Sequence, residues 1–273
     1  MYVTTAAETG RGTAAVTVWL EETRTQHFPA GAHRVDDEFS ARHHTDLAAG
    51  FGLTYRDDLP RSGTTFAAMA AGLVTERDEV QLAVVTHKTP DLDCRYAAGT
   101  YLSDLPGAPL SFALSGPGAP FSGILVAGRY QQRHGLDRAA VLAFDQDVLP
   151  YDVPVAQAVA GAAGCALLLG RSDGPGRPLT VAQRGGRDLD GAIEDIGKTV
   201  GPLWSGLTVL HGATVPAAVA AEYAGGGRVT ALADEGRPAT AVLERLTAEA
   251  AALYVGIDAV SGEAVACLLG SEL

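Results

Sequence analysis

The stretch that decides the fold is SFALSGPGAPFSG, at residues 111–123. It predicts a buried strand over Ser111–Leu114, then a glycine-proline turn, and then a helix that begins near Pro120. Many α/β enzymes present a nucleophile or bind an anion at such a turn, because its glycines let the backbone turn sharply and the helix N–H groups face the ligand. We call residues 115–119 the first elbow, and no cysteine lies on it.

The composition is that of a globular protein and restricts the partners. The chain has 273 residues, of which 47% are hydrophobic and 19% are charged, so it can bury a sizeable core. Its net charge of −12, with no cluster of lysine and arginine, argues against nucleic acid or an anionic membrane as a partner. No apolar run reaches the roughly 18–20 residues of a membrane helix, and we see no signal-peptide pattern at the N-terminus.

The cysteines indicate neither a metal site nor a disulfide framework. Cys94, Cys165 and Cys267 lie far apart in the sequence, unlike zinc ligands or paired cysteines. We interpret them as small buried residues of a protein in the reducing cytoplasm, and we expect no nucleophilic role for Cys94. The GPG of the first elbow lacks the GK[ST] ending of a phosphate loop, and we expect neither a metal nor another cofactor.

Apolar strands alternate with helices along most of the chain, which predicts a parallel sheet covered on both faces. We expect residues 27–45 to be polar and irregular. The predicted strands lie at residues 13–20, 80–85, 111–114, 139–144, 163–170, 207–210, 229–232, 252–257 and 263–269. The predicted helices lie at residues 64–74, 95–105, 121–132, 189–200, 216–223 and 239–252.

Two pairs of segments suggest an internal duplication. VTALADEGRPATAVLERL at 229–246 repeats the strand, elbow and helix of the opening stretch, and we call its turn, residues 236–240, the second elbow. LTVLHGATVP at 207–216 repeats VQLAVVTHKTP at 80–90: each is a strand that ends on a histidine and is followed by threonine and proline. Because the two pairs occur in the same order, we predict two related halves, residues 1–152 and 153–273.

At this point the residues resemble a family. The order of the motifs is similar to that of the thiolase fold, within it the ketoacyl-ACP synthase III (chalcone-synthase-like) branch. The resemblance runs from Val80 to the C-terminus, and the first 60 residues match poorly. It implies an α/β fold with α/β/α/β/α layers and two duplicated halves with mixed, mainly parallel sheets. Besides the first elbow and residues 207–216, it rests on VVTHKTPD (84–91), VLAFDQDVLPYD (141–152), GAAGCALLLGRSD (161–173), DEGRPATAVLERL (234–246) and VGIDAVSGEAVACLLG (255–270).

The resemblance also implies which residues should carry the chemistry. The family uses a cysteine on the first elbow, acylated by the substrate, together with a histidine and an asparagine. This chain has Gly118 at the cysteine position, between Pro117 and Ala119, and Arg237 at the asparagine position. His211 matches the catalytic histidine. The stretch from the first elbow to His211 is also shorter than in the family.

Each candidate residue also has a structural interpretation. His211 could be a remnant catalytic base, or a packed or capping histidine. Ser115, Gly116 and Gly118 form the candidate oxyanion loop, whereas Ser115 and Ser122 fit capping or turn roles better than a nucleophilic one. The adjacent His43 and His44 do not suit a metal site, because in a strand they would face opposite sides. His87 is expected to be exposed or partnered.

Two hypotheses for the function follow from this resemblance. In the first, the chain is a non-catalytic subunit, a pseudoenzyme of bacterial secondary metabolism (polyketide or fatty-acid-derived), in a dimer with a cysteine-containing ketoacyl synthase III-like enzyme. Short subunits without active-site residues are known in heterodimeric condensing enzymes of this family. In the second, it is a cysteine-free acyltransferase or thioester hydrolase with His211 as the general base and the first elbow as the oxyanion hole. Acyl-CoA or an acyl carrier protein is the implied substrate.

Overall fold

The chain divides into two compact units that are interleaved in the sequence. Unit 1 comprises Met1–Val18, Arg177–Ala233 and Glu249–Leu273, and unit 2 comprises Trp19–Gly176 and Asp234–Ala248. The computed structural model describes residues 15–29, 31, 33–35, 37–50, 52–56, 58, 62–93, 95, 98–104, 109–116, 118–148, 159, 161–171, 174–201, 207–232, 236–259 and 261–270.

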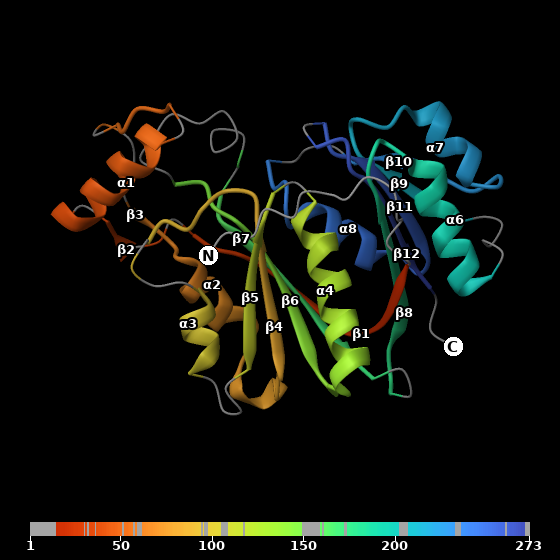
Figure 1. Ribbon diagram of the computed structural model, residues 1–273, viewed down its shortest axis with the longest axis horizontal. Helices are drawn as coiled ribbons and strands as arrows, with labels where there is room; N and C mark the ends of the chain where they lie inside the picture. The colour runs from red at the N-terminus through yellow and green to blue at the C-terminus, as the bar shows by residue number, and fades with distance from the viewer. Residues whose placement is uncertain are drawn as a thin grey trace. The chain divides into compact units, whose positions relative to one another are not determined.

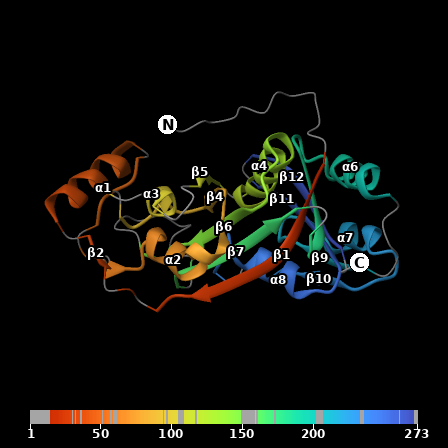
Figure 2. The same cartoon turned by 90° about the horizontal axis from the view of Figure 1, so that it is seen from below.

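The strands of unit 2 lie in the order β1-β7-β6-β4-β5 (Figure 1). Strand β4 pairs in parallel with β5 and β6, whereas β7 pairs antiparallel with β6 and β1. Figure 2 shows β1 running alongside β7. These strands are β1 (Val16–His27, whose first three residues belong to unit 1), β4 (Leu82–His87), β5 (Leu110–Ser115), β6 (Ala139–Asp145) and β7 (Ala163–Gly170).

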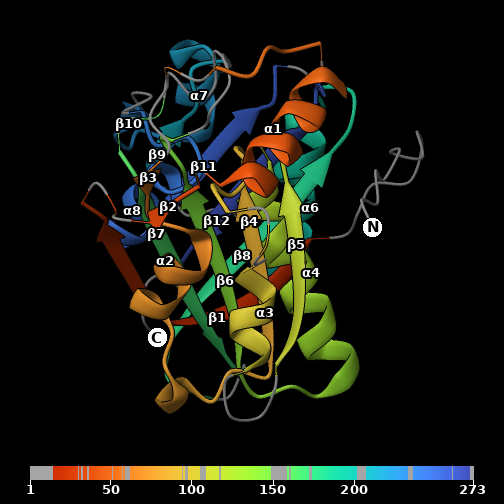
Figure 3. The same ribbon diagram turned by 90° about the vertical axis from the view of Figure 1, so that its left-hand side faces the viewer.

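Helices cover both faces of the central strands of unit 2 (Figure 3). On one face, α2 (Phe66–Leu73) and α3 (Ala98–Ser103) pack on a core that contains Val85 of β4 and Phe144 of β6. On the other face lies α4 (Ala119–His134). Unit 2 also contains β2 (His33–Arg34), α1 (Glu38–Gly50), β3 (Ser62–Gly63), a 3-10 turn (Glu76–Asp78) and α8 (Ala241–Ala248).

A glycine allows α4 to lie close to the sheet. A Cβ atom on Gly123 would be 2.7 Å from Thr86 Cγ2 and 3.0 Å from Val141 Cγ1. Thr86 and Val141 belong to β4 and β6, so at this position the helix backbone packs directly on side chains of the two strands. This contact fixes the height of the helix whose N-terminus forms the first elbow.

The strands of unit 1 lie in the order β10-β9-β11-β12-β8, with the first residues of β1 next to β8. Strand β9 pairs in parallel with β10 and β11, whereas β12 pairs antiparallel with β11 and β8. Helices α6 (Leu189–Val200) and α7 (Ala217–Tyr223) pack on an apolar core that contains Val209 and Leu253. The strands are β8 (Arg177–Arg184), β9 (Thr208–His211), β10 (Val229–Ala231), β11 (Ala252–Ile257) and β12 (Ala264–Leu269).

The two sets of strands have the same topology. Strands β2 and β3 form a separate sheet and are left out of the comparison. The remaining strands are numbered 1 to 5 along the chain, from β1 to β7 in one set and from β8 to β12 in the other. Both sets then have the order 3-2-4-5-1 and the same parallel and antiparallel pairs. The helices correspond as well, since α2, α3 and α4 occupy the chain positions of α6, α7 and α8. This correspondence supports the predicted duplication. The first set of strands ends with β7 at Gly170, and the second begins with β8 at Arg177.

Four expectations about local structure need correction. Residues 38–50 form helix α1, which begins after Asp37, whose carboxylate accepts from the Ser40 N–H and hydroxyl. Strand β5 is half-buried rather than buried, because it pairs only with β4 among the described strands. Strand β8 was not expected from the sequence, and β1 extends seven residues beyond the predicted end at Leu20.

Within the described residues, no helix has the length and hydropathy needed to cross a membrane.

Candidate functional site

The first elbow is held by main-chain hydrogen bonds. Gly116 has a φ of 125°, which favours glycine, and its N–H donates to the His87 carbonyl over 3.0 Å. The Ala119 N–H donates to the Gly116 carbonyl over 3.1 Å. Ser115 is exposed at the end of β5, opposite His87 in the parallel pair. The predicted sharp turn between strand and helix is therefore present.

Gly118 occupies the N-cap of α4. Its φ of −86° and ψ of 0° are open to any residue, so the turn does not itself require glycine here. The Phe121 and Ser122 N–H groups both donate to the Gly118 carbonyl over 3.1 Å, which starts the helix. A side chain at the N-cap would lie at the positive end of the helix dipole, where a thiolate is stabilised. Gly118 brings no side chain to this position.

His87 lies directly beside the first elbow. Its Nδ1 donates to the Thr89 carbonyl over 2.8 Å, and its ring lies 5.3 Å from the ring of Phe66, measured between centroids. Burial lowers the pKa of the imidazole, so the neutral form is favoured. His87 was expected to be exposed or partnered, and it is partnered.

The second elbow is held by side chains. The Asp145 carboxylate, at the end of β6, accepts from the Ala239 and Thr240 N–H groups over 2.9 Å each and from the Thr240 hydroxyl over 2.7 Å. Burial raises the pKa of this carboxyl, and the three donors oppose that effect. Asp145 was not identified as a site residue from the sequence. A charged residue at the end of an otherwise apolar strand was the available signal.

Arg237 is part of the same elbow and is engaged in an ion pair. Its guanidinium donates to Glu244 Oε2 of α8, and it contacts His27 Nε2, at the end of β1, over 3.0 Å. The Arg237 side chain is 12% exposed. Arg237 therefore joins the start of α8 to the end of β1, whereas the family has an asparagine at the matching position.

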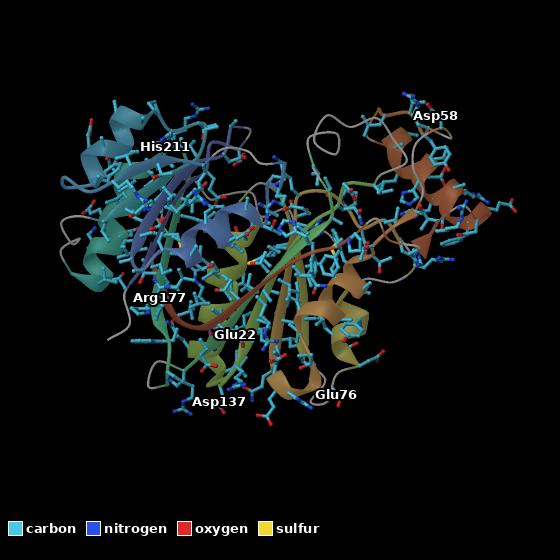
Figure 4. The ribbon with its side chains drawn as sticks, turned by 180° about the vertical axis from the view of Figure 1, so that it is seen from behind. Glu22, Asp58, Glu76, Asp137, Arg177 and His211 are labelled. Atoms are coloured by element: carbon cyan, nitrogen blue, oxygen red, sulfur yellow. The ribbon has the colours of Figure 1, made fainter. Side chains whose placement is uncertain are left out.

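His211 is the last residue of β9 and belongs to unit 1 (Figure 4). It is 6% exposed, and its Nδ1 lies 3.2 Å from the Gly212 carbonyl. Because a carbonyl only accepts, Nδ1 carries the proton and Nε2 is the basic nitrogen of the neutral ring. The first elbow and Arg237 lie in unit 2, so the predicted site residues come from both units.

The remaining candidates are structural. Cys165 and Cys267 are buried in β7 and β12, and burial raises the pKa of both thiols, that of Cys165 to about 12. Cys94 and Pro117 lie outside the described residues. His43 and His44 are on helix α1, not on a strand, and His44 Nε2 donates to the Leu92 carbonyl over 3.1 Å. In the part of the chain that the structure describes, no group of three His, Cys, Asp or Glu side chains could hold a metal ion.

The duplicated α/β topology with an elbow before α4 and another before α8 is that of the thiolase fold, and the predicted fold class is confirmed. Solved structures similar to the chain are of Xanthomonas campestris OleA, a ketoacyl synthase III-like condensing enzyme of the thiolase superfamily. No family model and no curated protein sequence matches the chain.

Three OleA structures show how far the similarity extends. OleA with bound acetamide has a TM-score of 0.58 at 13% sequence identity, over 93% of this chain and 98% of the other. An OleA variant with cerulenin has a TM-score of 0.59 at 13% identity, over 94% and 97% of the two chains. A variant with lauric acid and lauroyl-CoA has a TM-score of 0.54 at 13% identity, also over 94% and 97%. At this identity the similarity establishes the fold alone.

Proposed function

We propose that the chain is a non-catalytic, thiolase-fold partner subunit of a cysteine-containing ketoacyl synthase III-like condensing enzyme. The observation that carries this proposal is Gly118 at the N-cap of α4, where the family resemblance calls for the nucleophilic cysteine. Arg237, at the position of the family asparagine, is committed to an ion pair with Glu244. Without a thiol and an amide, the elbows have no groups to carry an acyl chain and bind its carbonyl oxygen.

Strand β5 is the edge through which we expect the partner to bind. Its six residues, LSFALS, carry no charge and no proline, and Leu110 is 50% exposed. Natural proteins shorten or charge exposed edge strands to prevent unwanted pairing. The topologically equivalent β10 has only three residues and follows Arg228, whereas β5 has six residues and follows Pro109. We assign β5 to antiparallel pairing with the matching strand of the catalytic subunit.

The substrate class follows from the partner. An OleA variant has been seen with lauric acid and lauroyl-CoA. We propose that the dimer acts on acyl-CoA or an acyl carrier protein in bacterial secondary metabolism, on a polyketide or fatty-acid-derived product, in the cytoplasm. The cysteine-containing subunit performs the condensation, and this chain completes the dimer.

Co-expression tests the partner role. The chain is produced alone and together with a cysteine-containing synthase subunit encoded next to it, and each preparation is assayed with acyl-CoA. We expect an inert chain alone and an active heterodimer after co-expression. Turnover by the chain alone, or failure of the two subunits to co-purify, would contradict the proposal.

A matched pair of variants tests the edge. Ala113→Lys places a charge on an exposed position of β5, and Ala231→Lys does the same on β10. We expect Ala113→Lys to weaken heterodimer formation at least tenfold, and Ala231→Lys to leave it within about twofold, because a lysine disfavours strand pairing only where a strand pairs. Equal effects of the two variants would show that β5 is not part of the interface.

The cysteine-free acyltransferase or hydrolase remains a second candidate because of the hydrogen bond at His211. The Gly212 carbonyl fixes the tautomer with a basic Nε2, which is what a general base requires. In that case the chain alone turns over acyl thioesters, His211→Ala abolishes the activity, and replacement of the exposed His134 does not. Inactivity of the purified chain with acyl-CoA and acyl carrier substrates would reject this candidate.

A further inference from the structure

The loop after β4, residues 88–93, holds several segments of unit 2 together, and we call it the hub loop. The Thr89 hydroxyl donates to the Gln146 carbonyl, 3.2 Å away, just beyond the end of β6. The Thr89 carbonyl accepts from His87, whose own carbonyl accepts from Gly116 of the first elbow. His87 thus connects the hub loop to the first elbow through these two hydrogen bonds.

The hub loop also anchors the segment that carries β2 and α1. Asp93 is 2% exposed, and its carboxylate lies 2.7 Å from His33 Nε2 of β2 and accepts from Arg95 Nε over 3.0 Å. The Leu92 carbonyl accepts from His44 of α1. This segment belongs to the first 60 residues, which match the family resemblance poorly.

Asp91 joins the hub loop to the start of α2. Its Oδ1 accepts from the N–H of Phe66, the first residue of α2, over 3.0 Å. Its Oδ2 is enclosed by protein and has no hydrogen-bond partner among the described residues. One oxygen is therefore held at a helix N-terminus, while the other is removed from water without a hydrogen bond among the described residues. The removal from water favours a neutral carboxyl.

Few charged groups act on Asp91. The N–H groups of Phe66, Leu92 and Asp93 favour the carboxylate, and the negative charge of Asp93 opposes it. Helix α2 has the sequence FAAMAAGL and carries no titratable side chain. Burial is the largest effect and raises the pKa of Asp91 from 3.8 to about 7.

We propose that the hub loop is a proton-dependent latch, in which protonated Asp91 keeps the loop closed on the start of α2 and loss of the proton releases it. In the released state the carboxylate reaches water, and the contacts of the hub loop with α2 and α1 loosen together. The opening and closing of the latch do not depend on whether the chain is a partner subunit or an enzyme, because all the residues involved belong to unit 2.

Linkage sets the size of the effect. In the open loop Asp91 has its ordinary pKa of 3.8, and in the closed loop about 7. The ratio of open to closed loop then rises about tenfold between pH 6 and pH 8 and levels off above that range. His44 is buried against the Leu92 carbonyl, and burial lowers the pKa of its imidazole from the ordinary value.

Hydrogen exchange of the full chain tests the latch. Exchange is followed by mass spectrometry at pH 6, 7 and 8, corrected for the intrinsic pH dependence of exchange. We expect the protection of residues 64–70 and 88–93 to fall about tenfold in the wild type from pH 6 to pH 8. In Asp91→Asn, which keeps the acceptor for Phe66 but cannot lose a proton, we expect a change below twofold.

The controls separate the latch from general loosening. Asp104→Asn replaces an exposed carboxylate after α3 and is expected to keep the pH dependence of the wild type. Strand β7 is expected to keep its protection at all three pH values. Unchanged wild-type protection between pH 6 and pH 8 overturns the proposal even if Asp91→Asn does not fold, as does an equal fall in wild type and Asp91→Asn.

Discussion

Removing the Asp145 carboxylate should destabilise unit 2 by loosening the second elbow. In Asp145→Ala, the Ala239 and Thr240 N–H groups and the Thr240 hydroxyl lose their acceptor in a buried site. A buried group left without a partner costs about 1–3 kcal/mol, and the hydroxyl can rotate toward another acceptor. We therefore expect the free energy of unfolding to fall by about 3–5 kcal/mol.

Two milder variants grade the effect. Asp145→Asn keeps one acceptor oxygen and should cost about 1–2 kcal/mol, and Thr240→Val removes only the hydroxyl and should cost about 1 kcal/mol. Urea unfolding followed by circular dichroism gives the loss, and hydrogen exchange of residues 236–248 shows whether it is local. Asp137→Ala, at an exposed surface ion pair, is the control and should change stability by less than about 0.5 kcal/mol. A cost below about 1 kcal/mol for Asp145→Ala, or equal costs for the alanine and asparagine variants, would refute the role of the carboxylate.

Four other predictions concern the elbows, the helix behind the first of them, and the hub loop. Gly118→Cys should fold, because the backbone there accepts any residue, and its thiol should react with a disulfide reagent near pH 7; a thiol with an ordinary pKa of about 8.5 would show that the helix start does not activate it. Gly123→Ala should lower the free energy of unfolding by about 1–3 kcal/mol, since its Cβ would lie 2.7 Å from the nearest side-chain atom, and an unchanged urea midpoint would contradict this packing. Asp91→Asn should gain stability over the wild type as pH rises from about 4 to 7, because the wild type loses stability when a carboxyl with a raised pKa must ionise. The difference between the ordinary pKa of 3.8 and the pKa of about 7 in the folded chain sets an upper limit of about 4 kcal/mol on this gain at pH 8. A gain that is the same at pH 4 and pH 8 would reject the raised pKa. A double-mutant cycle between Arg237 and Glu244 should give a coupling of about 1 kcal/mol, and additive single variants would show that the ion pair contributes nothing.

Central strands such as β7 and amphipathic helices such as α6 could be predicted from the sequence, because the spacing of their apolar residues fits only one type of secondary structure. The β7 segment AGCALLLG is buried at every position, so it forms a continuous apolar run whose ends coincide with those of the strand. Helix α6 was also predicted over its full length, since apolar residues recur at helical spacing and Asp188 caps its start.

The elements that the sequence did not reveal depend on tertiary contacts. Helix α1 has a polar composition and buries only Ser40, His44 and Ala48, which are four residues apart on one face. Its sequence therefore lacks the apolar stripe by which an amphipathic helix is predicted. Strand β8 buries Thr180 and Gln183 among apolar residues, which hides its pattern. Asp91 could not be identified either, because its significance lies in an enclosed oxygen that only the packing of α2 against the hub loop creates.

The two elbows occupy equivalent places in a duplicated topology but are built differently. The first is held by main-chain groups, at Gly116 and the His87 carbonyl, and leaves its helix N-cap without a side chain. The second is held by Asp145 from the end of β6 and by the pair of Arg237 with Glu244. A catalytic elbow must keep its side chains free for substrate, whereas an elbow whose polar groups are all used in structural contacts is suited to fix the position of a helix. This difference supports the proposed partner role, in which the chain contributes shape to a dimer and the chemistry belongs to the other subunit.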